Sequence, residues 1–182
     1  MTEDVVQGDL GDCYFLSVLS ALAEKPNRIH SLFQYQNLSP NGIFECKVVI
    51  HGNIVPVVID DFFPCKEVSE GVFKPAFAGI NEKTNNIWPM ILEKVWAKVN
   101  INFDNIISGV PSEAFSFLSP APYETFYHEK THDILFEKIK LADQADYIIC
   151  CSITQTDTTV NLDYLSKVGL ISNHAYTVIG QL

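Results

Sequence analysis

The segment Gln7-Gly8-Asp9-Leu10-Gly11-Asp12-Cys13-Tyr14-Phe15-Leu16 decides the fold of this chain, because a loop with two glycines leads directly into a helical pattern. After the loop, apolar residues recur at spacings of three and four, in the set Phe15, Leu16, Val18, Leu19, Leu22 and Ala23. This spacing predicts a helix with Asp12 as N-cap. The helix should end before Pro26, because proline lacks the N–H that a helix needs. Cys13 is therefore expected in the first helical turn.

The position of Cys13 favours a nucleophile over a structural thiol. Unpaired N–H groups and the helix dipole create positive potential at a helix N-terminus, where a thiol loses its proton more readily. The negative charge of Asp12 opposes this effect, and most isolated cysteines are simply buried in a core. The glycine loop and the helix start together favour a reactive Cys13.

A nucleophilic thiol needs a base, and His174 has the most suggestive surroundings of the five histidines. It lies in the segment Ser172-Asn173-His174-Ala175-Tyr176-Thr177-Val178-Ile179-Gly180, whose pattern predicts a strand entered from a loop. His174 follows Cys13 by 161 positions (174 − 13), as expected when separate structural units supply nucleophile and base. Taken alone, a histidine at a strand start is more often an ordinary hydrogen-bonded side chain.

Six segments in chain order resemble the protease core of the calpain family, a branch of the papain-type cysteine proteases. They are residues 7–16, 57–61, 88–100, 112–115, 151–153 and 174–178. The resemblance covers nearly the whole chain and implies an α+β, papain-like fold. It also implies a mainly helical first subdomain over residues 1–119, with the nucleophile helix. Residues 120–182 would begin an antiparallel-β second subdomain, incomplete here, that carries the histidine.

The resemblance assigns roles to three residues. Cys13 would attack the peptide carbonyl as a thiolate, and His174 would accept the thiol proton and later protonate the leaving amine. Gln7 would donate a side-chain N–H, together with the backbone N–H of Cys13, to the oxyanion. The family's third catalytic residue, an asparagine that orients the imidazole, is expected beyond Leu182. We therefore expect a calpain-type endopeptidase of intracellular proteins or, alternatively, a truncated and inactive fragment that binds partners.

Several positions depart from the calpain pattern. Tyr14 stands where the family has tryptophan, Val110 where it has the second glycine of a pair, and Asn173 where it has glycine. Asp4 matches an acidic ligand of a calcium site in the first subdomain, but Asn86 replaces the second acidic ligand. Calcium needs several oxygen ligands, mostly carboxylates. We therefore expect no cofactor in this chain and no calcium binding at Asp4 at micromolar concentrations.

Composition limits the classes of partner. The chain has 182 residues, enough for one large or two small domains, and hydrophobic residues, at 47%, suffice for a core. A net charge of −10 argues against nucleic acid and anionic membranes as partners. The acidic start and the lack of an apolar run near about 20 residues predict neither a signal peptide nor a transmembrane segment. We expect protein substrates, with further domains possible in a longer calpain-like chain.

The cysteines indicate a reducing compartment. Their number is odd and their spacing irregular: Cys13, Cys46, Cys65, Cys150 and Cys151. No C-x-x-C pair occurs, so the pattern favours neither a disulfide framework nor a structural zinc site. Reduced thiols and the lack of a signal segment predict an intracellular, cytoplasmic protein.

Periodicity and turn residues predict the other elements. Helices are expected over residues 27–33, 88–99 and 134–142, the second with Asn85 or Asn86 as N-cap. Strands 43–50 and 54–59 should form a hairpin with a three-residue loop, and further strands are expected over residues 72–78 and 147–153. Residues 108–122, with three prolines, should connect the two subdomains. The polar residues 155–161 should form an exposed loop.

A rival motif, His128-Glu129-Lys130-Thr131-His132, matches the H-E-x-x-H zinc pair of many metalloproteases. On a helix, His128 and His132 would share one face. No convincing third ligand follows, and the helix is expected to begin only near Thr131 or Asp133, so the motif would straddle a loop. Zinc-dependent hydrolysis is therefore a distant alternative.

Overall fold

The computed structural model describes residues 1–37, 39–153 and 161–180, with only the backbone of residues 129–133. Its helices are η1 (Thr2–Asp4), α1 (Cys13–Leu22), α2 (Pro26–His30), α3 (Trp88–Val99), η2 (Asp104–Ile106), α4 (Pro111–Leu118), α5 (His128–Gln144) and α6 (Leu162–Lys167). Its strands are β1 (Ile43–Ile50), β2 (Asn53–Asp60), β3 (Cys65–Ser69), β4 (Val72–Pro75), β5 (Cys150–Ile153) and β6 (His174–Thr177). The strands pair as three antiparallel ribbons, β1–β2, β3–β4 and β5–β6, within these residues. The chain is therefore α+β, as predicted.

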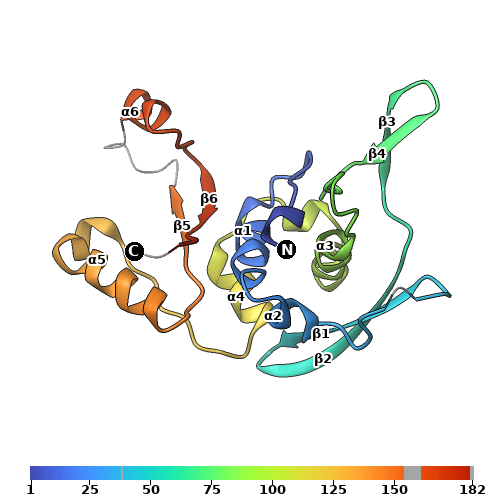
Figure 1. Cartoon of the computed structure of the whole chain (residues 1–182), viewed down its shortest axis with the longest axis horizontal. Helices are drawn as coiled ribbons and strands as arrows, with labels where there is room; N and C mark the ends of the chain where they lie inside the picture. The colour runs from blue at the N-terminus through green and yellow to red at the C-terminus, as the bar shows by residue number, and fades with distance from the viewer. Residues whose placement is uncertain (38, 154–160, 181–182) are drawn as a thin grey trace.

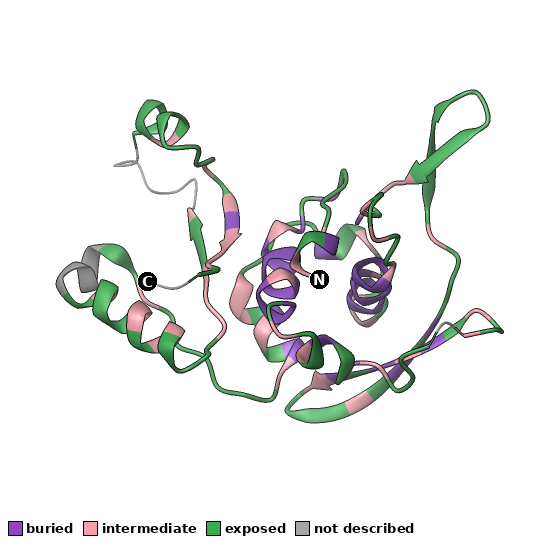
Figure 2. Ribbon diagram, in the orientation of Figure 1, coloured by how far each residue is buried: buried purple, intermediate pink, exposed green. Residues whose placement is uncertain are grey.

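Helix α1 lies between two groups of elements (Figure 1). One group contains α3 and the hairpins β1–β2 and β3–β4, and the other contains α5, α6 and the β5–β6 ribbon. Burial is concentrated in α1 and α3 (Figure 2), and β6 packs against α1. Within the described residues, we find no helix with the length and apolar character needed to cross a membrane.

Helix α1 has the predicted start and end. Asp12 is its N-cap, and the helix stops before Pro26, which opens α2. The side chain of Asp12 makes no capping hydrogen bond. The second helix covers residues 26–30 instead of 27–33, because proline is well suited to the first helical position. The most deeply buried residues of α1 are Phe15, Val18, Leu19 and Ala21.

Helix α3 has the predicted bounds and packs beside α1. The ring of Trp96 stacks on Phe15, with centroids 5.6 Å apart and planes parallel to within 1°. Phe117 of α4 completes the cluster at 4.5 Å from Trp96. The predicted N-cap was wrong: Ile87 takes that position, because the backbone of Asn85 has a left-handed φ of 53° and turns the chain earlier.

The predicted connecting passage over residues 108–122 contains a helix, α4, over residues 111–118. Pro111 lies in the first turn of α4, where the missing N–H costs nothing. The Val110 N–H donates to the Glu113 carboxylate at 3.4 Å, which satisfies a free donor at the helix start. Ala114, Phe117 and Leu118 are buried, so α4 belongs to the core.

The hairpins correct two strand predictions. The β1–β2 turn has two residues instead of three, because His51 (φ 50°) and Gly52 (φ 77°) form a left-handed turn of the kind that suits hairpins. The strand predicted over residues 72–78 ends at Pro75 as β4. Its partner β3 is exposed along its length and lacks the apolar alternation that would have revealed it.

The second group of elements follows the predicted order with different bounds. Helix α5 spans residues 128–144 instead of 134–142, and β5 begins at residue 150 instead of 147. The short helix α6 was not anticipated; the Asn161 side chain caps it by accepting the Tyr164 N–H at 3.1 Å. The predicted loop at 155–161 falls mostly in residues 154–160, outside the described residues.

Candidate active site

The loop before α1 is held tightly against the rest of the fold. The Asp9 N–H donates to the Ala76 carbonyl at 3.2 Å, and the Asp9 carboxylate pairs with Lys66 of β3. A Cβ on Gly8 would lie 1.7 Å from a backbone carbonyl oxygen, so only glycine fits there. Cys13, half-buried, is the first residue of the helix that this loop enters. The loop therefore fixes the position of the thiol.

One cavity of about 240 Å³ brings together the three residues that the sequence singled out. Cys13 from the start of α1, His174 from the start of β6 and Gln7 from the loop all line it. The His174 ring packs edge-on against Tyr176, with centroids 4.8 Å apart and planes at 84°. The side-chain Nε2 of Gln7 donates to the Leu10 carbonyl at 3.0 Å. A thiol, an imidazole and an amide thus line the same cavity.

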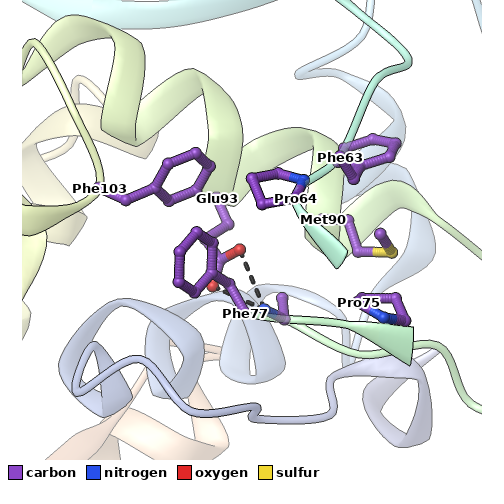
Figure 3. A pocket seen from close by; sticks show the side chains of 8 residues that line it. Phe63, Pro64, Pro75, Phe77, Met90, Glu93 and Phe103 are labelled. Carbon is purple, nitrogen blue, oxygen red and sulfur yellow. Dashed lines mark hydrogen bonds between the residues drawn. The ribbon is translucent and has the colours of Figure 1, made fainter. Parts of the chain in front are cut away.

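Two buried carboxyl groups lie behind the thiol. Asp12 is 0% exposed and Glu93 of α3 is 3% exposed. The two Glu93 oxygens accept the Ala78 N–H at 2.9 and 3.0 Å (Figure 3). The rings of Phe77 and Phe103, with centroids 4.4 Å apart, lie beside the Glu93 carboxyl group (Figure 3). In the described part of the chain, no N–H or hydroxyl donates to either Asp12 oxygen.

The two carboxyl groups share about one proton at neutral pH. Burial, with the neighbouring Asp12 charge, raises the pKa of Glu93 to about 9. Burial also raises the pKa of Asp12 to about 6, although the adjacent Glu93 side chain acts in the opposite direction. One negative charge therefore remains beside Cys13 and is not absorbed by helix N–H groups. Sequence reasoning missed Glu93; its buried neighbours one turn away, Pro89 and Ala97, are the signal that places it on an apolar face.

The chain agrees with a family model along its whole described length. A model described as calpain family cysteine protease matches residues 1–181. The chain belongs to this calpain family. Over 180 residues it is 31% identical to the mouse calpain-1 catalytic subunit, covering 97% of this chain and 24% of the mouse protein. Over 183 residues it is 39% identical to the calpain-type cysteine protease DEK1 of Arabidopsis thaliana, covering 97% of this chain and 8% of that protein.

The calpain assignment has a defined scope. The chain spans about a quarter, or less, of the length of these relatives. It is a calpain-type cysteine protease domain of the α+β class, as the sequence resemblance predicted. The division into residues 1–119 and 120–182 stays a prediction.

Tyr14, which replaces the tryptophan usual in calpains, lies in the core and not in the wall of the cavity. It is 3% exposed, its hydroxyl donates to the Ile106 carbonyl at 3.1 Å, and it accepts the Trp96 Nε1–H at 3.0 Å. A Cβ on Gly109 would lie 2.5 Å from the Tyr14 ring, which explains the glycine. The next residue, Val110, is half exposed.

Asn173 replaces a calpain glycine directly before His174. Its φ of 55° is left-handed, a conformation that glycine adopts freely and asparagine adopts more easily than other residues. The substitution therefore keeps the backbone turn that leads into β6.

The zinc motif at residues 128–132 lies on a helix, but most of its side chains are outside the described residues. Helix α5 begins at His128, so the whole motif is helical, contrary to the predicted start near residue 131 or 133. The sequence does not mark this start, because the N-cap is Tyr127, whose side chain cannot cap a helix as Ser, Thr, Asp or Asn can. The side chains of Glu129 and His132 lie outside the described residues. Among the side chains that are described, no cluster of three metal-binding groups occurs.

Proposed function

We propose that this chain is the catalytic core of a calpain-type cysteine endopeptidase that hydrolyses peptide bonds of proteins through Cys13 and His174. The observation that carries the proposal is the single cavity lined by both residues and by Gln7. Cys13 attacks the scissile carbonyl as a thiolate. His174 accepts the thiol proton and returns it to the leaving amine, after which water hydrolyses the acyl-enzyme.

The oxyanion is stabilised by two N–H donors from the start of α1 and its loop. The backbone N–H of Cys13 is at the first helical position, where no carbonyl of the helix can accept it. The Gln7 amide carries two N–H groups, and among the described residues one of them is used, by the Leu10 carbonyl. The second N–H supports the role that the calpain resemblance implies.

The main alternative is a calpain-like fragment that binds partners without cutting them. The net charge of −10 and the family both support proteins, rather than nucleic acids, as the molecules bound. The cytoplasmic location predicted from the cysteine pattern stays a prediction. The two functions differ in the reactivity of Cys13, because only the enzyme needs an activated thiol.

Calcium does not fit the Asp4 site in this chain. Asp4 is fully buried, and its Oδ2 already accepts N–H groups from Trp88 at 2.9 Å and from Asn86 at 3.1 Å. Burial alone would raise the pKa of Asp4, but hydrogen bonds, including those from Trp88 and Asn86, lower it below its ordinary value. Both donors bind Oδ2, whereas Oδ1 has no hydrogen-bond partner among the described residues. Asn86 turns an N–H toward the carboxylate where calcium would need an oxygen, so this arrangement supports the expectation of no micromolar calcium binding.

The decisive experiment compares alkylation rates of the five thiols. Cys65 is exposed and Cys13 only half-buried, so access alone predicts that iodoacetamide labels Cys65 faster. Burial raises the pKa of both Cys46 and Cys150 to about 12, so these should react slowly. We expect Cys13 to be labelled fastest near neutral pH, with site-resolved mass spectrometry as the measurement.

Two variants complete the test. His174→Ala should bring the Cys13 rate below that of Cys65, whereas His51→Ala, which changes an exposed histidine in the β1–β2 turn, should leave it unchanged. A Cys13 rate no higher than that of Cys65 in the unaltered chain would refute the enzyme and favour the binding fragment.

A further inference from the structure

Three side chains meet where the β5–β6 ribbon packs on α1. The Thr177 hydroxyl of β6 donates to the Ser17 carbonyl of α1 at 2.5 Å. Cys150 of β5 is the direct cross-strand partner of Thr177, and its thiol interacts with the Ser17 side chain. The Ser17 hydroxyl also donates to the Tyr14 carbonyl at 3.0 Å. We call this group Ser17, Cys150 and Thr177 the junction.

The junction lies close to both proposed catalytic residues. Ser17 follows Cys13 by four positions, so the two lie on one face of α1 about one turn apart. Thr177 ends the four-residue strand that His174 begins. Ser17 and Thr177 also line the cavity that holds Cys13 and His174. A short helix segment and a short strand thus connect the junction rigidly to the two reacting groups.

Other contacts between α1 and the β5–β6 ribbon are less directional. Ala175 is 7% exposed and packs β6 into the core, but this apolar contact does not fix which residues of β6 lie opposite which residues of α1. Lys25 and Arg28 bind Asp146, but these groups are exposed and lie beyond the far end of α1 from Cys13. Between the described residues of α1 and β6, by contrast, the hydrogen bond from Thr177 to Ser17 is short, directional and part-buried.

We propose that Thr177 is a positioning residue: its hydrogen bond to Ser17, supported by Cys150, sets the placement of His174 relative to Cys13. The inference rests on the proposed function, because it assumes that His174 activates the Cys13 thiol. Thr177 makes or breaks no bond in the proposed reaction, although its side chain lines the same cavity. It acts by fixing where the strand that carries the imidazole lies on the helix that carries the thiol.

The test measures Cys13 alkylation by iodoacetamide between pH 5 and pH 9 in the 182-residue chain. Thr177→Val keeps the shape of the side chain but removes the hydroxyl, and we expect it to lower the Cys13 rate at neutral pH by about five- to tenfold. Thr177→Ser, which keeps the hydroxyl, should restore most of the rate. Thr125→Val, at an exposed threonine, is the matched control and should change nothing.

A double mutant separates positioning from a general structural effect. In a His174→Ala background, Thr177→Val should cause no further loss, because the group that it positions is gone. An equal loss in both backgrounds would overturn the proposal. The proposal would also be overturned if Thr177→Val left the Cys13 alkylation rate unchanged while His174→Ala clearly lowered it. In that case the proposed function would stand.

The remaining outcomes are also decisive. If Cys13 of the unaltered chain reacts no faster than Cys65, the proposed function and the inference fail together. Cys150→Ala removes the other arm of the junction without changing Thr177, and should lower the Cys13 rate in the same direction. A thermal melt followed by circular dichroism would show whether Thr177→Val folds. If it does not fold, an unchanged Cys13 alkylation rate in Cys150→Ala would by itself overturn the proposal.

Discussion

Replacing Glu93 by glutamine should make this protein more stable at neutral and alkaline pH. Glu93 is 3% exposed and lies against the equally buried Asp12, with no cation in contact with either among the described residues. The folded state therefore has to keep a proton on the pair, whereas the unfolded chain releases it. Glutamine keeps the shape of the side chain, needs no proton, and offers Asp12 an amide N–H.

The size of the effect follows from the pKa of Glu93, which rises from 4.5 to about 9 on folding. Between these values the folded state binds more protons than the unfolded state. The free energy of unfolding therefore falls as pH rises, by up to about 1.4 kcal/mol per pH unit. From pH 5 to pH 7 the loss from Glu93 amounts to about 2–3 kcal/mol. Asp12 adds a loss of the same sign between its ordinary value of 3.8 and about 6.

Urea unfolding at pH 5, 6, 7 and 8 provides the measurement, because it yields a free energy of unfolding at each pH. The stability of Glu93→Gln relative to the unaltered chain should increase steadily with pH. Histidines and surface carboxylates titrate in both proteins, so their contributions cancel in the difference. Glu70→Gln, at an exposed position in the β3–β4 turn, is the matched control and should give a flat difference.

Parallel stability curves for the unaltered chain and Glu93→Gln would refute this reasoning, because they would mean that Glu93 is ionised in the folded protein. A difference that falls with pH would refute it more strongly, since Glu93 would then be stabilised as a carboxylate.

Two further predictions concern calcium and the loop before α1. Isothermal titration should detect no micromolar calcium binding, and micromolar binding that disappears in Asp4→Ala would restore calcium to the mechanism. Gly8→Ala should lower the free energy of unfolding by about 1–3 kcal/mol, because its Cβ would overlap a backbone carbonyl. Gly11→Ala is the control, because its Cβ would meet its nearest neighbour at an ordinary 3.6 Å, and it should change the free energy of unfolding by no more than about 0.5 kcal/mol. Equal losses of stability in the two variants, measured by thermal melts, would contradict the argument.

Helix bounds were predicted most accurately where a single strong sequence pattern determines the element. The stripe through Trp88 and Trp96 gave both ends of α3, and the glycine loop with its following stripe gave α1. The three residues that the sequence patterns and the calpain resemblance indicate, Cys13, His174 and Gln7, line one cavity. Their catalytic roles stay proposals, since lining a cavity does not demonstrate chemistry.

The failures occur where tertiary packing overrides a local signal. Pro111 was interpreted as a break, although the same residue is favoured at a helix start, and only the burial of α4 distinguishes the two. Glu93 carried no prediction, although the apolar residues one turn away on either side, Pro89 and Ala97, place it on a face that the fold buries. Thr177 carries no sequence signal of its own, since its partner Ser17 is 160 positions away.

That separation of 160 positions also has a consequence in time. At synthesis rates of roughly 5–20 residues per second, Ser17 leaves the ribosome roughly 8–32 s before Thr177. Throughout this interval the nascent chain carries the thiol of Cys13 but not the imidazole of His174. Under the proposed mechanism, a half-made copy therefore cannot cleave its own emerging segments or its neighbours. The distance between nucleophile and base along the chain delays proteolytic capability until synthesis has passed β6.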